Sequence, residues 1–183
     1  MSEPMTVSPQ DAAAALREIE ETQVRSTTLR GYQYAAPHFL VWGVIWIVGY
    51  GLSDVFRGHA NAIWGVLVPI GLIAGLFIKR DASRAVSWRY AATAVATLSF
   101  FVATFFVMWP VSGRQISAFI PLVVALMYVL GGIWAGWRYV VAGIAVAALT
   151  LVGFVWLSSH FLLWMAIVGG GALMLAGLWL RRV

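Results

Sequence analysis

Apolar residues fill most of this chain in blocks that are long enough to cross a lipid bilayer. The hydrocarbon core of a membrane needs about 20 apolar residues per helix. By this measure we predict helical spans at approximately residues 36–53, 60–78, 90–111, 116–135, 138–157 and 160–180. The pattern therefore predicts an all-α polytopic membrane protein with six transmembrane helices.

Short polar or turn-forming segments separate these predicted spans. The breaks at residues 112–115, 136–138 and 158–160 are so short that the helices on either side should be antiparallel neighbours. If the fourth and fifth spans were one helix, Arg138 would sit in the middle of the bilayer, at a cost of about 2.5–3.5 kcal/mol. We therefore expect the six spans to pair into three antiparallel hairpins.

The first 34 residues differ in charge from everything that follows them. They carry five acidic residues and three arginines, whereas the remaining 149 residues carry nine basic and two acidic residues. We expect two parts in the chain, a polar cytoplasmic head over residues 1–34 and a six-helix transmembrane domain over residues 35–183.

The head has the pattern of a short amphipathic helix. Ser8, Pro9 and Asp11 form a capped helix start, and a narrow apolar stripe follows at helical spacing. A cytoplasmic helix over about residues 8–30 fits two roles. It would serve either as a collar on the base of the membrane domain or as a docking site for a membrane or cytoplasmic partner protein.

The distribution of basic residues predicts which side of the membrane each connection faces. With the N-terminus in the cytoplasm, ten of the twelve basic residues lie on the cytoplasmic side, and only Arg57 and Arg114 lie outside. Cytoplasmic connections are normally enriched in lysine and arginine. We therefore expect both termini in the cytoplasm. The excess of arginine over lysine and the many alanines favour the inner membrane of a bacterium.

Two short patterns recur at the ends of the predicted spans. An arginine and a tyrosine lie together at residues 30–32, 88–90 and 137–139, where the odd-numbered spans begin. Residues 74–80 also match residues 176–182 at an offset of 102 positions. These matches predict an internal triplication of one helical hairpin. Convergence is the alternative, because helix ends at the cytoplasmic face generally favour aromatic and basic residues.

The composition excludes several classes of protein. The chain is 62% hydrophobic and 10% charged, with a mean hydropathy of +0.87. Soluble domains are only about 45–50% apolar and about 25% charged, so a soluble enzyme is excluded. The net charge of +5 does not gather on one polar face, so no nucleic-acid partner is expected. The absence of cysteine excludes disulfides and thiolate metal sites.

Ionisable residues are missing from the middle of every predicted span. Ion-coupled transporters usually keep such a group there, so proton-coupled transport is not expected. The chain also has no glycine-rich phosphate loop and no Gly-x-Ser-x-Gly motif. The sequence therefore predicts no catalytic residue and favours a protein that is not an enzyme.

Large aromatic residues are frequent inside the spans, close to residues that loosen helices. Pro69 and the glycines at residues 169–171 weaken the second and sixth spans at comparable depths. An apolar cavity for a lipid, a quinone or a pigment would follow. The residues expected to line it are Trp46, Tyr50, Trp64, Pro69, Phe105, Tyr128, Trp164 and Gly170. Ordinary packing and contact with lipid are the alternative for these rings.

Two histidines and one carboxylate lie in the predicted outer turns. His59 and His160 occupy equivalent places in the first and third hairpins, and Asp54 precedes the first of them. If the hairpins surround a common axis, the two imidazoles would be placed to ligate a metal or haem, with Asp54 as a ligand or an orienting group. Interfacial histidines beside lipid headgroups are the alternative.

These patterns lead to three functional hypotheses. The first is an accessory or sensory membrane protein that binds a partner helix or a small apolar ligand and signals through its head. The second is a small facilitator or channel for an uncharged or hydrophobic solute. The third is a redox subunit that binds haem or a metal. Membrane lipids are expected partners in each case, and small-residue pairs such as Gly71 and Gly75 fit packing within the chain or a homo-oligomer.

Overall fold

The computed structural model of the protein describes residues 9–78 and 88–182, and almost all of this length is helical. The helices are α1 (Pro9–Val55), α2 (Ala60–Phe77), α3 (Trp88–Val107), α4 (Gly113–Ala135), α5 (Trp137–Trp156), α6 (Phe161–Trp164) and α7 (Gly170–Arg181). The 3₁₀ turns η1 (Arg57–His59) and η2 (Ser158–His160) precede α2 and α6, and the π-helical segment η3 (Met165–Gly169) joins α6 to α7. Because no strand occurs in the described ranges, the prediction of an all-α protein is confirmed for them.

Among the described residues, five helical segments are long and apolar enough to cross a membrane. They are Ala12–Val55, Arg57–Phe77, Gly113–Ala135, Trp137–Trp156 and Ser158–Arg181. The described part of α3 contains a shorter apolar stretch, Val95–Val107. The prediction of several helices that are able to cross a membrane is confirmed.

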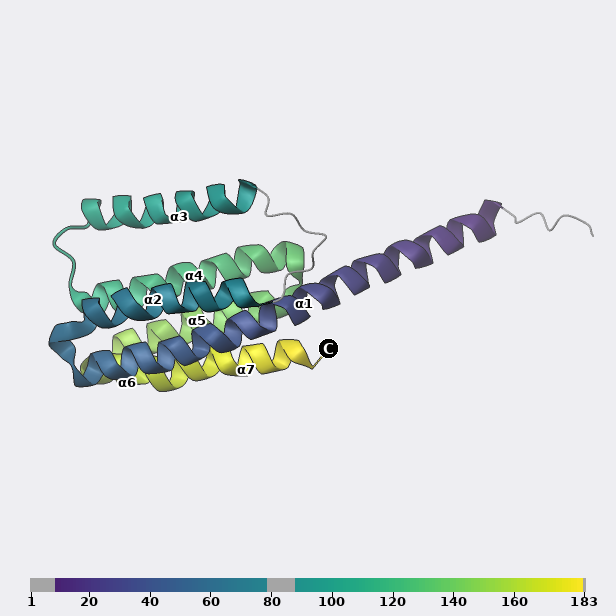
Figure 1. Ribbon diagram of the computed structural model, residues 1–183. Coiled ribbons are helices and arrows are strands. Elements are labelled where there is room, and N and C mark those ends of the chain that lie inside the picture. Colours follow the sequence, from purple (N-terminus) through teal and green to yellow (C-terminus); the bar gives the residue numbers. More distant parts are fainter. Residues whose placement is uncertain (1–8, 79–87, 183) are drawn as a thin grey trace, which may run out of the picture.

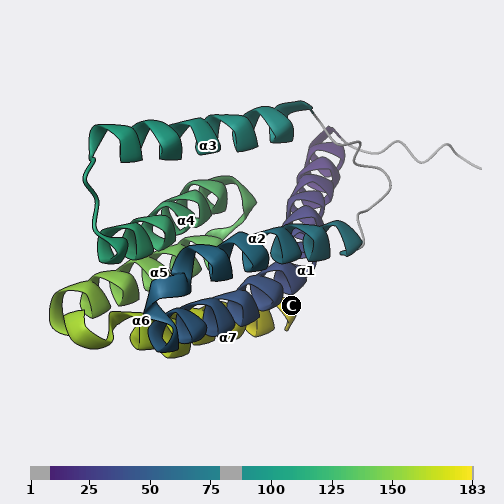
Figure 2. The same ribbon diagram turned by 60° about the vertical axis from the view of Figure 1, so that its left-hand side comes forward.

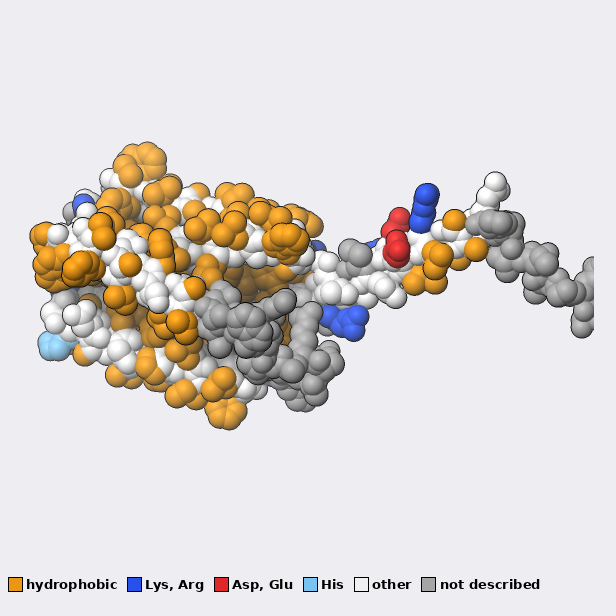
Figure 3. Space-filling model, turned by 90° about the horizontal axis from the view of Figure 1, so that it is seen from above, with side chains coloured by type: hydrophobic (Ala, Val, Ile, Leu, Met, Phe, Trp, Pro, Cys, Tyr) orange, Lys and Arg blue, Asp and Glu red, His pale blue; other side chains and the backbone are white. Residues whose placement is uncertain are grey.

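The apolar helices lie side by side in one bundle (Figure 1). α4 packs along α5, α1 packs along α7, and α2 packs on α1. α3 stands at the edge of the bundle in both ribbon views (Figure 1, Figure 2). On the face seen in the space-filling view (Figure 3), apolar side chains cover much of the bundle, and the acidic side chains visible there lie on the helix that projects from it.

α1 joins the predicted head helix and the first predicted span into one helix of 47 residues. Pro37 lies inside this helix and removes one backbone donor, which neighbouring helices make tolerable in membrane proteins. After Pro37 the helix buries Phe39, Trp46 and Tyr50 in the bundle, whereas Leu16 near its start is exposed. The polar and apolar parts of the chain are therefore continuous in the structure.

Glycines allow α1 and α7 to approach each other closely. A Cβ atom on Gly43 would lie 3.1 Å from the carbonyl oxygen of Gly170, and a Cβ atom on Gly170 would lie 3.0 Å from that of Gly43. Small residues permit such backbone contact between membrane helices. The π-helical segment η3 ends at Gly169, directly before this crossing. The glycine run of residues 169–171 therefore ends the π-helical segment and also provides the close contact with α1.

Aromatic and basic residues tie α1, α5 and α7 together at the end of the bundle near the projecting helix. We name Tyr32, Arg138, Tyr139 and Trp179 the Arg138 cluster. Arg138 Nη1 donates a hydrogen bond of 2.9 Å to the carbonyl oxygen of Trp179, and the guanidinium carbon lies 4.8 Å from the centre of that indole. Tyr139 Oη donates a bond of 2.9 Å to the carbonyl oxygen of Gly31, and the rings of Tyr32 and Tyr139 are 5.3 Å apart. The cluster therefore joins three helices that are distant in the sequence.

The Arg138 cluster also brings two of the predicted repeats into contact. Residues 30–32 and 137–139 meet in it, whereas the side chains of residues 88–90 lie outside the described residues. The second pair of matching segments lies at the ends of α2 and α7: residues 74–78, the described part of 74–80, and residues 176–182. Both of these helices pack on α1. The internal triplication stays a prediction.

Candidate functional site

An apolar cavity of about 410 Å³ lies between α1, α2, α3 and α4. We call it the apolar cavity. It is lined by Trp42, Trp46, Tyr50, Ala60, Asn61, Trp64, Val68, Phe101, Gly113, Ile116, Ser117, Ile120, Val124, Tyr128 and Leu173. Most of these side chains are aliphatic or aromatic, and the polar ones are few. This composition is typical of sites for small apolar ligands.

Aromatic rings on α1 and α2 form one wall of the apolar cavity. The Tyr50 ring meets the Trp64 ring edge-on with 4.9 Å between their centres, and the Trp46 ring meets Tyr50 edge-on at 5.8 Å. Phe39, which is also on α1, stacks on Tyr128 of α4 with 4.5 Å between the ring centres. Edge-on and offset ring pairs stabilise a packed arrangement beyond the area they bury. The wall is therefore held in shape by contacts among its own rings.

A hydrogen bond from Tyr50 links this wall to a weak point of α4. Tyr50 Oη donates a bond of 2.9 Å to the carbonyl oxygen of Ser117. In a regular helix that carbonyl would accept from the amide four residues later, but this residue is Pro121, which has no N–H. The tyrosine therefore supplies the donor that the proline removes, and it attaches α1 to α4 beside the apolar cavity.

Replacing Tyr50 with phenylalanine should lower the free energy of unfolding by about 1–3 kcal/mol, because the Ser117 carbonyl would lose its donor. Unfolding in detergent micelles, followed by circular dichroism, measures this change. In a Pro121→Ala background, the restored amide should bond the same carbonyl, and the effect of Tyr50→Phe should become smaller. An equal loss in both backgrounds would show that the hydrogen bond is not the cause.

Of the eight residues predicted to line a cavity, Trp46, Tyr50, Trp64 and Tyr128 come together in the apolar cavity. The lining residues that the sequence reasoning did not select include Trp42, Val68 and Ile120. Helical spacing would have indicated some of them. Trp42 lies one turn before Trp46, and Val68 lies one turn after Trp64, so each shares a face with a predicted residue.

The other predicted lining residues lie elsewhere. Pro69 is exposed on α2, and Gly170 lies at the crossing of α1 and α7. Trp164 packs against Gly153 of α5, and its Nε1 donates a bond of 2.8 Å to the carbonyl oxygen of Leu149. These three residues therefore serve the surface or the packing of the bundle.

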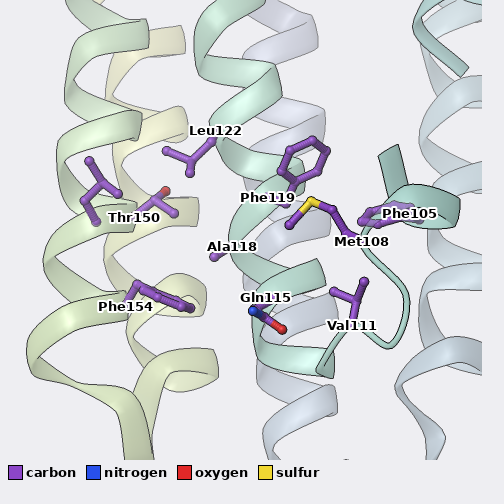
Figure 4. A pocket seen from close by; sticks show the side chains of 10 residues that line it. Phe105, Met108, Val111, Gln115, Ala118, Phe119, Leu122, Thr150 and Phe154 are labelled. Carbon is purple, nitrogen blue, oxygen red and sulfur yellow. The ribbon is translucent and has the colours of Figure 1, made fainter. Parts of the chain in front are cut away.

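Phe105, the remaining predicted residue, lines a second apolar pocket of about 200 Å³ between the end of α3, α4 and α5 (Figure 4). Thr150 and Phe154 of α5 lie on its opposite side. Phe119 of α4 packs against Phe105 with 5.5 Å between ring centres, and against Phe101 of the apolar cavity at 5.8 Å. The Phe119 contacts therefore attach α3 to the bundle next to both spaces.

A pocket with polar walls lies where α1 ends and α4 begins. We call it the polar pocket; its volume is about 270 Å³. It is lined by Ser53, Asp54, Arg57, Ala60, Gly113, Arg114, Ser117, Ser158, Ser159, Phe161 and Leu162. Arg57 Nη2 lies 3.3 Å from Asp54 Oδ1, so these two side chains form an ion pair at its rim.

The residues considered for a metal or haem lie at this same end of the bundle. Asp54 lines the polar pocket, and His59 and His160 end the turns η1 and η2 as exposed residues. Neither histidine lines the polar pocket. In the described ranges, no three histidine, cysteine or acidic side chains are grouped closely enough to hold a metal ion.

Comparison with known proteins identifies no family for this chain. No model of a protein family, no curated protein and no solved structure matches it. The function is therefore inferred from the cavities, contacts and charges of the chain itself.

Proposed function

We propose that this chain is a non-enzymatic accessory or sensory protein of the membrane, which binds a small apolar ligand in the apolar cavity. The observation that carries the proposal is the cavity itself, about 410 Å³ in volume and walled by Trp46, Tyr50, Trp64 and Tyr128. Sites for small molecules usually measure about 300–1,000 Å³ and are mainly apolar. The volume and the lining therefore fit a lipid chain, a quinone or a pigment.

The size of the apolar cavity favours a small ligand over a partner helix. Its volume of about 410 Å³ lies near the lower end of the usual range for small-molecule sites. A docked helix instead needs a groove that holds side chains from two or more turns, a length of about 11 Å. A partner helix would therefore have to bind elsewhere, and the exposed N-terminal half of α1, with Leu16 and Ile19 on its surface, is the segment that we propose for partner binding.

We further propose six membrane spans in three hairpins, with α3 as the third span and both termini in the cytoplasm of a bacterium. Figure 1 supports this arrangement, because successive connections alternate between the two ends of the bundle. Among the residues whose side chains the structure describes, six arginines lie in the first part of α1 or at the end of the bundle near it: Arg17, Arg25, Arg30, Arg138, Arg181 and Arg182. At the other end lie Arg57, in η1, and Arg114, in the first turn of α4. The excess of basic residues at the first end is typical of a cytoplasmic face.

A photo-crosslinking experiment tests ligand binding in the apolar cavity. The probe is a monoacylglycerol with a diazirine in its acyl chain, added to the full-length protein in micelles. Val68 is half-buried and lines the cavity, so Val68→Trp should fill the space and reduce labelling of the cavity residues at least tenfold. Val66 on the same helix is 60% exposed, so Val66→Trp adds an equal side chain outside the cavity and should leave labelling unchanged.

Labelled peptides, identified by mass spectrometry, locate the bound chain. We expect labels on residues that line the apolar cavity, such as Trp46 and Ile120. Competition by a quinone or by a free fatty acid then ranks the ligand classes. Equal labelling of the two tryptophan variants, or labels restricted to lipid-facing residues, would contradict the proposed function.

A further inference from the structure

The polar pocket and the apolar cavity adjoin each other. Ala60, Gly113 and Ser117 line both spaces, so the two spaces lie directly beside each other. One space is walled by rings and aliphatic chains, and the other by serines and charged side chains. A ligand that fills both spaces must therefore be an amphiphile with an apolar chain and a compact polar headgroup.

The charges of the polar pocket favour an anionic headgroup. Its walls contain two arginines and one carboxylate, and the carboxylate of Asp54 is paired with Arg57. Arg114 has no acidic partner among the described residues; its guanidinium carbon lies 4.9 Å from the centre of the Phe154 ring. An arginine that is not neutralised by an acid presents several N–H donors to a phosphate or carboxylate. The side chains that line the polar pocket therefore carry a net charge of +1, which an anionic headgroup would neutralise.

The buried hydroxyl of Ser53 independently favours a polar ligand in this pocket. Its side chain is 1% exposed and lines the polar pocket, and its hydroxyl has no hydrogen-bond partner in the described part of the chain. A buried hydroxyl without a partner is unfavourable, because it has lost its hydrogen bonds to water and has gained none in return. Ser158 and Ser159 add further hydroxyl donors, and Gly113 places the positive end of the α4 dipole at the same pocket. These groups are donors suited to the oxygens of a phosphate.

We propose that the polar pocket binds the phosphate group of a single-chain lipid whose acyl chain occupies the apolar cavity. This inference rests on the proposed function, because the chain is taken to be the apolar ligand. A single chain fits better than two, since the apolar cavity, about 410 Å³, lies near the lower end of the usual range for ligand sites. Arg114 and Ser53 bind the headgroup, and the ring wall binds the chain.

Binding of three probes to the full-length protein in micelles tests this inference. The probes are lysophosphatidic acid, the monoacylglycerol with the same chain, and inorganic phosphate. The unmodified protein should bind lysophosphatidic acid at least tenfold more tightly than monoacylglycerol. Inorganic phosphate alone should not displace either lipid at millimolar concentration.

Variants separate the headgroup site from the chain site. Arg114→Gln should weaken lysophosphatidic acid about tenfold and leave monoacylglycerol unchanged. Ser53→Ala should weaken only the phosphate lipid, about threefold, and Arg114→Lys should retain part of the preference. Arg182 is an exposed arginine that directly follows α7, so Arg182→Gln serves as the matched control and should change neither affinity.

The possible outcomes distinguish this inference from the proposed function. Equal affinity for the two lipids, or an equal effect of Arg114→Gln on both, would overturn the headgroup site and leave the proposed function intact. Displacement of the lipid by inorganic phosphate alone would overturn the lipid as the source of the phosphate. Failure of both lipids to bind, in a protein that folds normally by circular dichroism, would overturn the proposed function as well.

Discussion

Replacing Gly143 with alanine should lower the free energy of unfolding by about 2–3 kcal/mol, because α4 and α5 would be forced apart. A Cβ atom on Gly143 would lie 2.6 Å from the carbonyl oxygen of Ala125 and 2.9 Å from the amide nitrogen of Val129. Both atoms belong to the backbone, so no side-chain rotation relieves the overlap. The two helices pack along most of their length, and the separation would spread beyond this one contact.

Gly131 provides the matched control for this substitution. It lies on α4 of the same helix pair, and a Cβ atom there would have nothing within 4 Å. Gly131→Ala should therefore leave stability unchanged or raise it slightly, since alanine favours the helix more than glycine does. Unfolding of both variants in mixed micelles, followed by circular dichroism, decides the matter. Equal stability of the two variants would show that α4 and α5 are not in close contact.

Replacing Arg138 with alanine should lower the free energy of unfolding by about 3 kcal/mol. The variant loses the charged hydrogen bond to the Trp179 carbonyl and the stacking of the guanidinium on the indole ring. A hydrogen bond from a charged donor contributes about 1.5–3 kcal/mol, and a cation over an aromatic ring contributes about 0.5–2 kcal/mol. The same unfolding measurement applies, with tryptophan fluorescence as a second probe for the environment of Trp179.

Two further substitutions distinguish the contacts of the planar Arg138 guanidinium from the effect of its positive charge. Arg138→Lys keeps the positive charge but not the planar group, so it should recover less than half of the lost stability. Arg182 is exposed and makes no such bond, and Arg182→Ala should have little effect. If Arg138→Lys were as stable as the unmodified protein, charge alone would explain the role of this position.

The ends of the later helices could be predicted from the sequence because local chemistry determines them. Gly136 separates α4 from α5, and the serines at residues 158–159 follow the end of α5. The continuity of α1 was less evident. The composition changes near residue 35, but a change from polar to apolar residues alters only the surroundings of a helix. It does not remove backbone hydrogen bonds, so the helix continues to Val55.

The kind of residue at the candidate site could be predicted, but the set that comes together could not. Whether a tryptophan faces a cavity depends on how each helix is rotated against its neighbours. The π-helical segment η3 illustrates this dependence, because one extra residue turns the following face by about 100°. Trp164 precedes η3 and Gly170 follows it, so their positions relative to α1 could not be deduced from a regular helical period.

The polar pocket was also beyond the reach of sequence reasoning. Its serines and arginines come from the end of α1, the start of α4 and the turn η2. The sequence predicted only that Arg57 and Arg114 lie on the same side of the membrane. It contained no pattern that joins Ser53 to Arg114, because their proximity depends on the packing of helices that are distant in the chain.

Because α1 is one continuous helix, a small rotation of its buried part would become a larger displacement at its start. Trp46, in the wall of the apolar cavity, and the start of the helix at Pro9 belong to the same helix, and at 1.5 Å per residue they are about 55 Å apart. A tilt of about 5° at Trp46 would carry the far tip through about 5 Å. The displacement grows with distance from the bundle. A tilt too small to separate α1 from its neighbouring helices would therefore still move the projecting start of α1 by about the width of a side chain.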